Sequence, residues 1–200
     1  MLNINSISKT FNNKKILDNF SLSITKQGIY GLKGESGVGK TTLLKMIQNL
    51  EAIDSGTIEV GVKTSFMFQD FQLFPHFTVL ENVIYASKFC FRSSKEECLY
   101  KAKKILQDLD LLDKISEYPH RLSGGQKQRV AFARAIMIGA KLILCDEPTS
   151  GLDFESKENL KKILFSFLNG ESRVSFFIVS HDLEFLFSVC SETFLLKKPD

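Results

Sequence analysis

Hydrophobic and polar residues alternate with a period of two along much of the first third of the chain, which predicts β-strands. Phe20, Leu22 and Ile24 illustrate the alternation. A short apolar run at residues 28–32 leads directly into a glycine-rich stretch. Strands are predicted at residues 2–8, 20–24, 28–32, 56–60 and 64–68, and a helix at 40–50.

The middle of the chain has helical periodicity. Apolar residues recur at helical spacing over residues 78–89, and Ser94 followed by Glu97 predicts a capping box for the next helix. One apolar face of that helix comprises Leu99, Ala102, Ile105, Leu106 and Leu109. Pro119 separates it from a further helix that begins near Ser123.

The last third alternates between buried strands and helices. Residues 141–145 and 174–180 are near-continuous apolar runs, typical of parallel strands covered on both faces. Helices near 155–169 and 182–189 and a strand at 193–196 complete the pattern. The sequence therefore predicts one α/β domain over residues 1–200, with a parallel sheet flanked by helices, an antiparallel β part and a helical insertion at about 75–135.

Composition and charge narrow the class. Hydrophobic residues make up 44% of the chain, an ordinary globular value, and a net charge of +3 argues against a nucleic-acid partner. No apolar run approaches the length of a spanning helix or a signal peptide, so contact with a membrane is expected to go through a partner. Cys90, Cys98, Cys145 and Cys190 lack metal-ligand spacing and are expected to be reduced thiols.

A glycine-rich loop joins the strand at 28–32 to the helix at 40–50. Gly34, Gly39, Lys40 and Thr41 fit the phosphate-loop spacing, in the strand-to-helix context that the pattern requires. Glycines let successive N–H groups point at phosphate oxygens, Lys40 supplies charge, and Thr41 offers a hydroxyl to Mg²⁺.

Polar residues end the other predicted buried strands. Asp146 is suited to hold Mg²⁺, and Glu147 is directed differently and is suited to act as general base on a water. His181 follows residues 174–180, and Gln69 follows 64–68, although the pattern alone does not distinguish Gln69 from Gln72.

A second glycine pair raises the question of why one chain would carry two phosphate-binding segments. Ser123, Gly124 and Gly125 open a helix and can also present backbone N–H groups to a phosphate. The chain thus has two phosphate cradles.

Together these segments resemble the nucleotide-binding subunit of ABC transporters over essentially the whole chain. Residues 34–42, 122–135 and 142–147 carry the resemblance, with "SGLD" and "SHD" following in the family's order. The signature "LSGGQ" is the most specific part. The resemblance implies that ATP is bound by Phe11, Gly34, Ser36, Gly37, Val38, Gly39, Lys40, Thr41, Thr42, Ser123, Gly124, Gly125, Gln126 and Asp153. It implies that Glu147, His181 and Gln69 act in hydrolysis, and that Thr41, Gln69 and Asp146 serve Mg²⁺.

The resemblance also answers the question of the two cradles. It implies that two copies pair head to tail, so that the signature of one caps the γ-phosphate held by the phosphate loop of the other. A permease is the implied membrane partner, with an extracytoplasmic solute-binding protein beyond it and the chain at the cytoplasmic face of the inner membrane. Phe71, Phe74, Pro75 and Phe77 lie where the family docks its permease, or they belong to the core.

Within the family, "FQDFQLFPHFTVLENV" looks most like importers of polar amino acids. The alternative is a cassette that drives lipoprotein release or cell-division signalling, although such relatives often read "TGNLD" where this chain reads "PTSGLD". DNA-repair members carry a long coiled coil between the glutamine and the signature, and translation factors carry two cassettes; this chain has neither feature.

Overall fold

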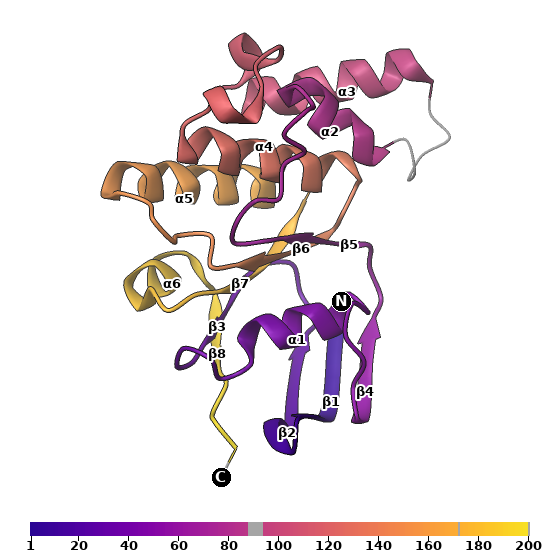
Figure 1. The fold of residues 1–200 in the computed structure, drawn as a ribbon, viewed down its shortest axis with the longest axis vertical. Coiled ribbons are helices and arrows are strands. Elements are labelled where there is room, and N and C mark those ends of the chain that lie inside the picture. The colour runs from indigo at the N-terminus through magenta and orange to yellow at the C-terminus, as the bar shows by residue number, and fades with distance from the viewer. Residues whose placement is uncertain (88–93, 172, 200) are drawn as a thin grey trace.

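A five-stranded parallel sheet forms the centre of the molecule (Figure 1). The structure, a computed structural model, describes residues 1–87, 94–171 and 173–199. In spatial order the strands are β5 (Thr64–Met67), β6 (Leu142–Asp146), β7 (Ser175–Val179), β3 (Ile29–Lys33) and β8 (Glu192–Leu195). Every residue of β6 and β7 is buried, as their continuous apolar sequences predict.

A smaller antiparallel sheet packs with helix α1 (Lys40–Ile47) on one face of the central sheet (Figure 1). Its strands are β1 (Leu2–Phe11), β2 (Lys14–Ile24) and β4 (Ser55–Val60), in the order β2-β1-β4. The buried face of β1 carries Leu2, Ile4 and Ile7, which contact the same apolar cluster as Leu43 and Leu44 of α1. The predicted antiparallel part is therefore present and lies next to the glycine-rich loop.

The remaining helices cover the opposite face (Figure 1). They are α2 (Val79–Ser87), α3 (Lys95–Asp108), α4 (Gly124–Met137), α5 (Phe154–Asn169) and α6 (Leu183–Val189), with short 3₁₀ helices η1 (Leu112–Lys114) and η2 (Pro119–Arg121). Within the described ranges, no helix has the length and apolarity that crossing a bilayer requires.

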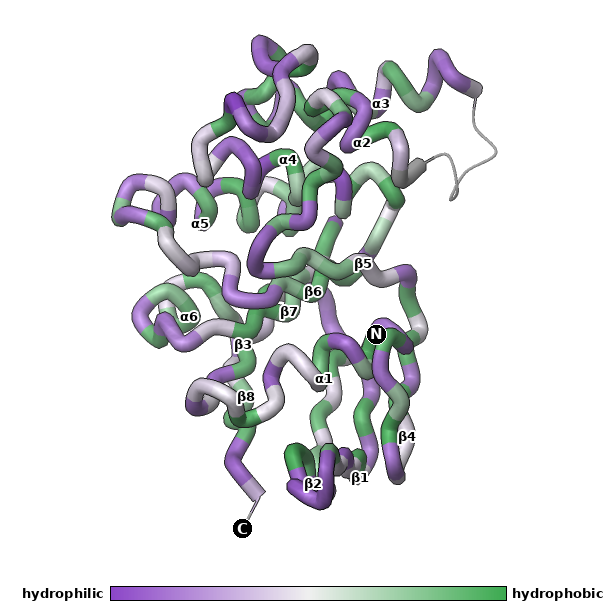
Figure 2. Tube along the Cα trace, in the orientation of Figure 1, coloured by the Kyte–Doolittle hydropathy of each residue, from purple (hydrophilic) through white to green (hydrophobic). Residues whose placement is uncertain are grey.

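Alternation along the central strands divides the interior into two cores. In β7, Phe176 and Ile178 pack with the helices α2 to α6, whereas Phe177 and Val179 pack with α1 and the antiparallel sheet. The rings of Phe176 and Phe132 of α4 meet edge to face, with centroids 6.2 Å apart. Figure 2 shows the resulting concentration of hydrophobic positions along the central strands.

The predicted helix start at Ser94 is confirmed. The Ser94 hydroxyl accepts a hydrogen bond from the Glu97 N–H, and the Glu97 side chain accepts one from the Ser94 N–H. Cys98, Cys145 and Cys190 are free thiols, and burial raises the pKa of Cys190 to about 12. Cys90 lies outside the described residues.

Candidate functional site

The glycine-rich loop between β3 and α1 depends on backbone conformations and close contacts that favour glycine. Gly37 and Gly39 have φ values of 74° and 108°. A Cβ on Gly39 would lie 2.6 Å from Cγ2 of Ile16, and one on Gly34 would lie 2.6 Å from the carbonyl oxygen of Leu196. No side chain caps the N-terminus of α1, so its first N–H groups are available to an anion.

Lys40 closes this loop on itself. Its Nζ donates hydrogen bonds to the carbonyl oxygens of Gly34 at 2.8 Å and Glu35 at 2.9 Å, and the residue is only 7% exposed. The positive charge is therefore held above the loop rather than in bulk solvent. A phosphate bound in the loop would offer Lys40 a charged acceptor in place of neutral carbonyls.

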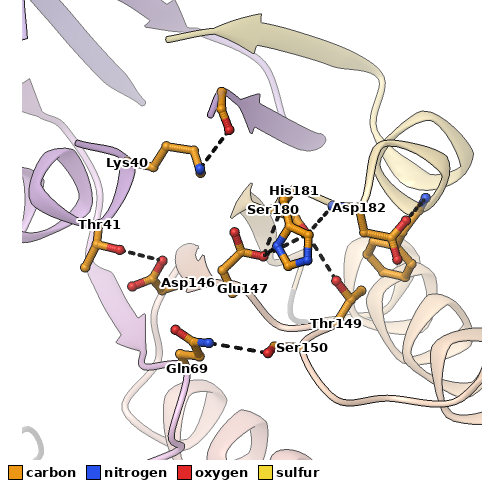
Figure 3. Close-up of polar contacts among 12 residues, drawn as sticks. Lys40, Thr41, Gln69, Asp146, Glu147, Thr149, Ser150, Ser180, His181 and Asp182 are labelled. Atoms are coloured by element: carbon orange, nitrogen blue, oxygen red, sulfur yellow. Dashed lines mark hydrogen bonds and ion pairs between the residues drawn. The ribbon is translucent and has the colours of Figure 1, made fainter. Parts of the chain in front are cut away.

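Thr41 and Asp146 bring two oxygen atoms together beneath the loop. The Thr41 hydroxyl donates to Asp146 Oδ1 at 3.0 Å, although 105 positions separate them in the chain (Figure 3). Burial raises the pKa of the Asp146 carboxyl above its usual value, the Thr41 hydrogen bond opposes this rise, and the charge of Glu147 adds to it. A hard cation would offset the buried charge, so this oxygen pair fits Mg²⁺. The described residues contain no cluster of three Asp, Glu, His or Cys ligands that could hold a metal ion. Phosphates and water would therefore supply the other ligands of Mg²⁺.

We predict that Asp146→Asn stabilises the nucleotide-free protein. The amide keeps an acceptor for Thr41 and removes a buried charge. We expect a gain in the free energy of unfolding of about 1 kcal/mol, a usual size for one stabilising substitution, or a rise in Tm of roughly 2–4 °C. An acid with a raised folded-state pKa stabilises the fold as it becomes protonated. The advantage of the variant should therefore shrink as the pH falls through that pKa.

Thermal unfolding in a metal chelator, at neutral and at mildly acidic pH, tests this expectation. Asp113→Asn is the matched control, because Asp113 is 70% exposed and should change Tm little. If the Tm of Asp146→Asn at neutral pH is equal to or below that of the parent, the buried charge of Asp146 does not destabilise the protein as expected.

The backbone and the carboxylate of Glu147 are both held by hydrogen bonds. Its φ of 47° is unusual for a residue with a side chain, and its N–H donates to the Val179 carbonyl at 2.8 Å. Its Oε2 lies 2.8 Å from His181 Nδ1, 3.2 Å from the His181 N–H nitrogen and 3.1 Å from Ser180 Oγ (Figure 3). The backbone turn directs the carboxylate away from Asp146, as the sequence predicts for neighbouring residues.

A single cavity of about 590 Å³ collects most of the predicted site residues. It opens beside the phosphate loop, and Phe11 at its rim is 39% exposed. Gln69 also lines it and donates from Nε2 to Ser150 Oγ at 3.3 Å. The lining residues are Phe11, Ile16, Ser36, Gly37, Gly39, Lys40, Thr41, Thr42, Gln69, Glu147 and His181.

Two loop residues contribute differently from the rest. Gly34 supplies a carbonyl to Lys40, and the Val38 side chain is 5% exposed and packs in the core beneath the loop. Only the backbone of Val38 is therefore in a position to meet a ligand.

The signature residues do not line this cavity. Ser123 caps α4, on the helical face of the central sheet, whereas the phosphate loop leads into α1 on the other face. The Ser123 hydroxyl accepts from the Gln126 N–H, and the Gln126 side chain accepts from the Ser123 N–H. Asp153 likewise caps α5, and its hydrogen bond from the Ser156 N–H lowers its pKa. One chain therefore does not bring its two glycine cradles to one ligand.

Sequence reasoning missed four residues around the cavity. Ile16 lines the cavity from β2, and Thr149, Ser150 and Ser180 hold polar groups next to it. Ser180 immediately precedes His181, so the same strand-end argument could have identified it. The others are revealed only by contacts between segments distant in the sequence.

Comparison with known proteins accounts for the presence of a phosphate loop and a separate glycine cradle in one chain. Residues 17–150 match the ABC transporter family. The chain belongs to the ABC transporter family. It is an ATP-binding subunit of the ABC transporter type and an ATPase.

Two curated ABC relatives illustrate the range of the family. The chain is 36% identical to the arginine transport ATP-binding protein ArtM of Bacillus subtilis (strain 168), over 92% of the chain and 82% of that protein. It is 38% identical to the lipoprotein-releasing system ATP-binding protein LolD of Bacteroides thetaiotaomicron, over 91% and 90% respectively.

The fold also matches a solved ABC cassette. The dimeric post-hydrolysis structure of the cassette MJ0796, bound to ADP and Pi, superposes with a TM-score of 0.88 at 29% identity, over 100% of this chain and 97% of that one. The predicted fold class, an ABC ATPase core with an antiparallel β part and a helical insertion, is confirmed.

Proposed function

We propose that the chain is a single ATPase domain that powers amino-acid import through a permease, by closing on ATP as a head-to-tail dimer at the cytoplasmic face of the membrane. The observation that carries this proposal is the division of the two glycine cradles between opposite faces of the sheet. A second copy related by a two-fold axis could supply its signature to this copy's phosphate loop.

The residues in and next to the cavity suit in-line attack by water on a γ-phosphate. The loop N–H groups and Lys40 would bind the phosphates, and Thr41 and Asp146, with Gln69 nearby, would hold Mg²⁺, which supplies charge neutralisation. Glu147 would accept the proton of the attacking water, and His181 Nδ1 keeps the Glu147 carboxylate in place.

The signature residues are suited to close the site from the partner copy. In this role Ser123 would donate its hydroxyl proton to the γ-phosphate, because its oxygen already accepts from Gln126. The N–H groups of Gly124 and Gly125 begin α4 and favour an anion. Asp153 caps α5 at the end of the "SGLD" segment, where we propose that it meets the partner.

We predict that Phe11→Ala weakens ATP binding to the monomer about tenfold, because a stacked base contributes on the order of 1–3 kcal/mol. Lys9 Nζ lies 4.8 Å from the Phe11 ring centroid, a favourable cation–π contact at the cavity rim. Equilibrium binding of a fluorescent ATP analogue measures the effect. Phe11→Tyr keeps the ring and should bind as the parent does; equal affinity for the Ala variant would exclude adenine stacking there.

A second hollow is the best place for the permease. It measures about 620 Å³ and combines aromatic side chains, among them Phe66, Phe74 and Tyr85, with polar ones. The polar lining residues are Gln48, Thr64, Ser65, Gln72 and Arg134. The sequence leaves undecided whether the aromatic residues after Gln69 form a docking surface or belong to the core. Phe74 is 37% exposed and lines this hollow, whereas Phe71 is partly buried and packs against the core. An amphipathic helix of a membrane protein fits such a surface.

Hydrogen bonds from Asn82 and Arg134 hold the loop after Gln69 in shape. Asn82 is fully buried, donates to the carbonyls of Phe74, Phe77 and Thr78, and accepts from the Phe74 N–H. Arg134 of α4 donates to the carbonyls of Phe71 and Gln72, both at 2.7 Å. A displacement of this loop by the permease would therefore be transmitted to Gln69, which precedes the loop, and to α4, which carries Arg134 and begins at the signature.

Lipoprotein release is the second candidate. The 38% identity to LolD favours it, whereas the match to ArtM and the "FQDFQLFPHFTVLENV" segment favour amino-acid import. The permease and its binding protein would choose the solute, because the proposed site residues are assigned to ATP and Mg²⁺.

Affinity capture from detergent-solubilised native membranes tests the proposal. We expect a multi-spanning permease together with an extracytoplasmic solute-binding protein, identified by mass spectrometry. Phe74→Asp, on the proposed docking surface, is the matched negative control. Capture of a protein with few spans and a large external domain would instead support lipoprotein release.

A further inference from the structure

Ser180 lies at the centre of a small buried network beside Glu147 (Figure 3). Its Oγ is 3.1 Å from Glu147 Oε2, 3.0 Å from Thr149 Oγ1 and 3.1 Å from the Asp182 backbone nitrogen. Ser180 is 0% exposed and Thr149 is 4% exposed. These hydrogen bonds are therefore shielded from exchange with water.

Counting protons fixes the direction of this network. The Asp182 N–H can only donate, and an ionised Glu147 carboxylate can only accept. The single Ser180 hydroxyl proton must therefore point to Glu147. Thr149 consequently donates to Ser180, so the chain of donors runs from Thr149 through Ser180 to Glu147.

The network distinguishes the two oxygens of Glu147. Oε2 accepts hydrogen bonds from the Ser180 hydroxyl, the His181 backbone N–H and His181 Nδ1. Oε1 accepts no hydrogen bond from the described part of the chain. The side chain of His181 is 70% exposed, so its bond competes with solvent. Ser180 is the side-chain donor to Oε2 that is fully buried.

We propose that Ser180, oriented by Thr149, is a positioning residue that holds the Glu147 carboxylate with Oε1 directed to the attacking water. The inference rests on the proposed role of Glu147 as general base. Because a misdirected base loses much of its effect, fixing the acceptor oxygen contributes directly to the rate of hydrolysis.

Ser180→Ala in the purified full chain tests the proposal. We expect kcat for ATP hydrolysis to fall about tenfold, the effect of one hydrogen bond to a charged group, while KM for ATP and equilibrium ATP binding stay at parental values. Thr149→Val keeps the side-chain shape and leaves Ser180 in place, so we expect a loss of about threefold.

Ser175→Ala is the matched control. Ser175 is, like Ser180, a fully buried serine; it begins β7, whereas Ser180 directly follows the other end of that strand, and its Oγ accepts from the Gly28 N–H at 3.2 Å. We expect this variant to lose stability but to keep its kcat. Thermal unfolding of each variant identifies misfolding, and if Ser180→Ala does not fold, Thr149→Val decides the question.

The combination with Glu147→Gln separates positioning from a general structural effect. In single-turnover hydrolysis, Ser180→Ala should cause no further loss once Glu147 has been replaced. If Ser180→Ala keeps the parental kcat while Glu147→Gln loses hydrolysis, the positioning role of Ser180 is wrong and the role of Glu147 stands. The same conclusion follows if Ser180→Ala lowers the single-turnover rate by the same factor in the parent and in Glu147→Gln. Hydrolysis by Glu147→Gln at the parental rate would instead overturn the role of Glu147 itself.

Discussion

Glu147→Gln is expected to stop ATP hydrolysis and to accumulate a stable ATP-bound dimer. Loss of a general base lowers a rate by about 10²–10⁴-fold, while the phosphate loop and the signature are unchanged. Because ATP would bind the closed dimer better than the open monomers, an unhydrolysed nucleotide should keep the two copies together. Phosphate release and light scattering with ATP measure the two effects.

The hydrogen bonds around Glu147 make glutamine a suitable replacement. Its amide oxygen can accept from Ser180 and His181 in place of Oε2, and its amide nitrogen takes the position of Oε1, which accepts no hydrogen bond from the described residues. Glu59→Gln, on the exposed side of β4, is the matched control and should hydrolyse ATP normally. Hydrolysis near the parental rate in Glu147→Gln would exclude the general-base role.

Most of the fold could be predicted because its elements have strong local signals. The continuous apolar runs at β6 and β7 predict burial on both faces, and the Ser94 capping box predicts the start of α3. The strand order could not be read from such patterns, because the neighbouring strands β5 and β6 are separated by more than a third of the chain. Pairing at that distance depends on the whole set of packing contacts.

The site was predictable to a different degree for each kind of residue. Lys40 and Glu147 follow from motif spacing, and the structure places both on one cavity. The Thr149–Ser180 network and the buried clamp of Asn82 could not be predicted, because a serine, threonine or asparagine alone does not reveal its partners. Their roles depend on backbone turns, such as the positive φ of Glu147, that bring distant segments together.

Ser123→Arg is expected to abolish ATP-dependent dimerisation while the monomer binds ATP with parental affinity. Ser123 lies outside the cavity of its own chain, so a change there should not reach the phosphate loop. In a two-fold dimer the substitution acts twice. Loss of one phosphate contact per site at about 1.5 kcal/mol each would weaken the dimer on the order of 10²-fold, before any steric conflict is counted.

The capping role of Ser123 requires a control that removes a helix cap without touching the proposed interface. Ser94→Arg provides it, because Ser94 and Glu97 form the same reciprocal pair at α3 that Ser123 and Gln126 form at α4. Each variant should lose about 1 kcal/mol of stability from its cap, but only Ser123→Arg should remain monomeric with ATP in light scattering. Dimer formation by Ser123→Arg at parental ATP concentrations would mean that the second glycine cradle does not bind the partner's nucleotide. The separation of the two cradles on opposite faces of the sheet would then need a different explanation.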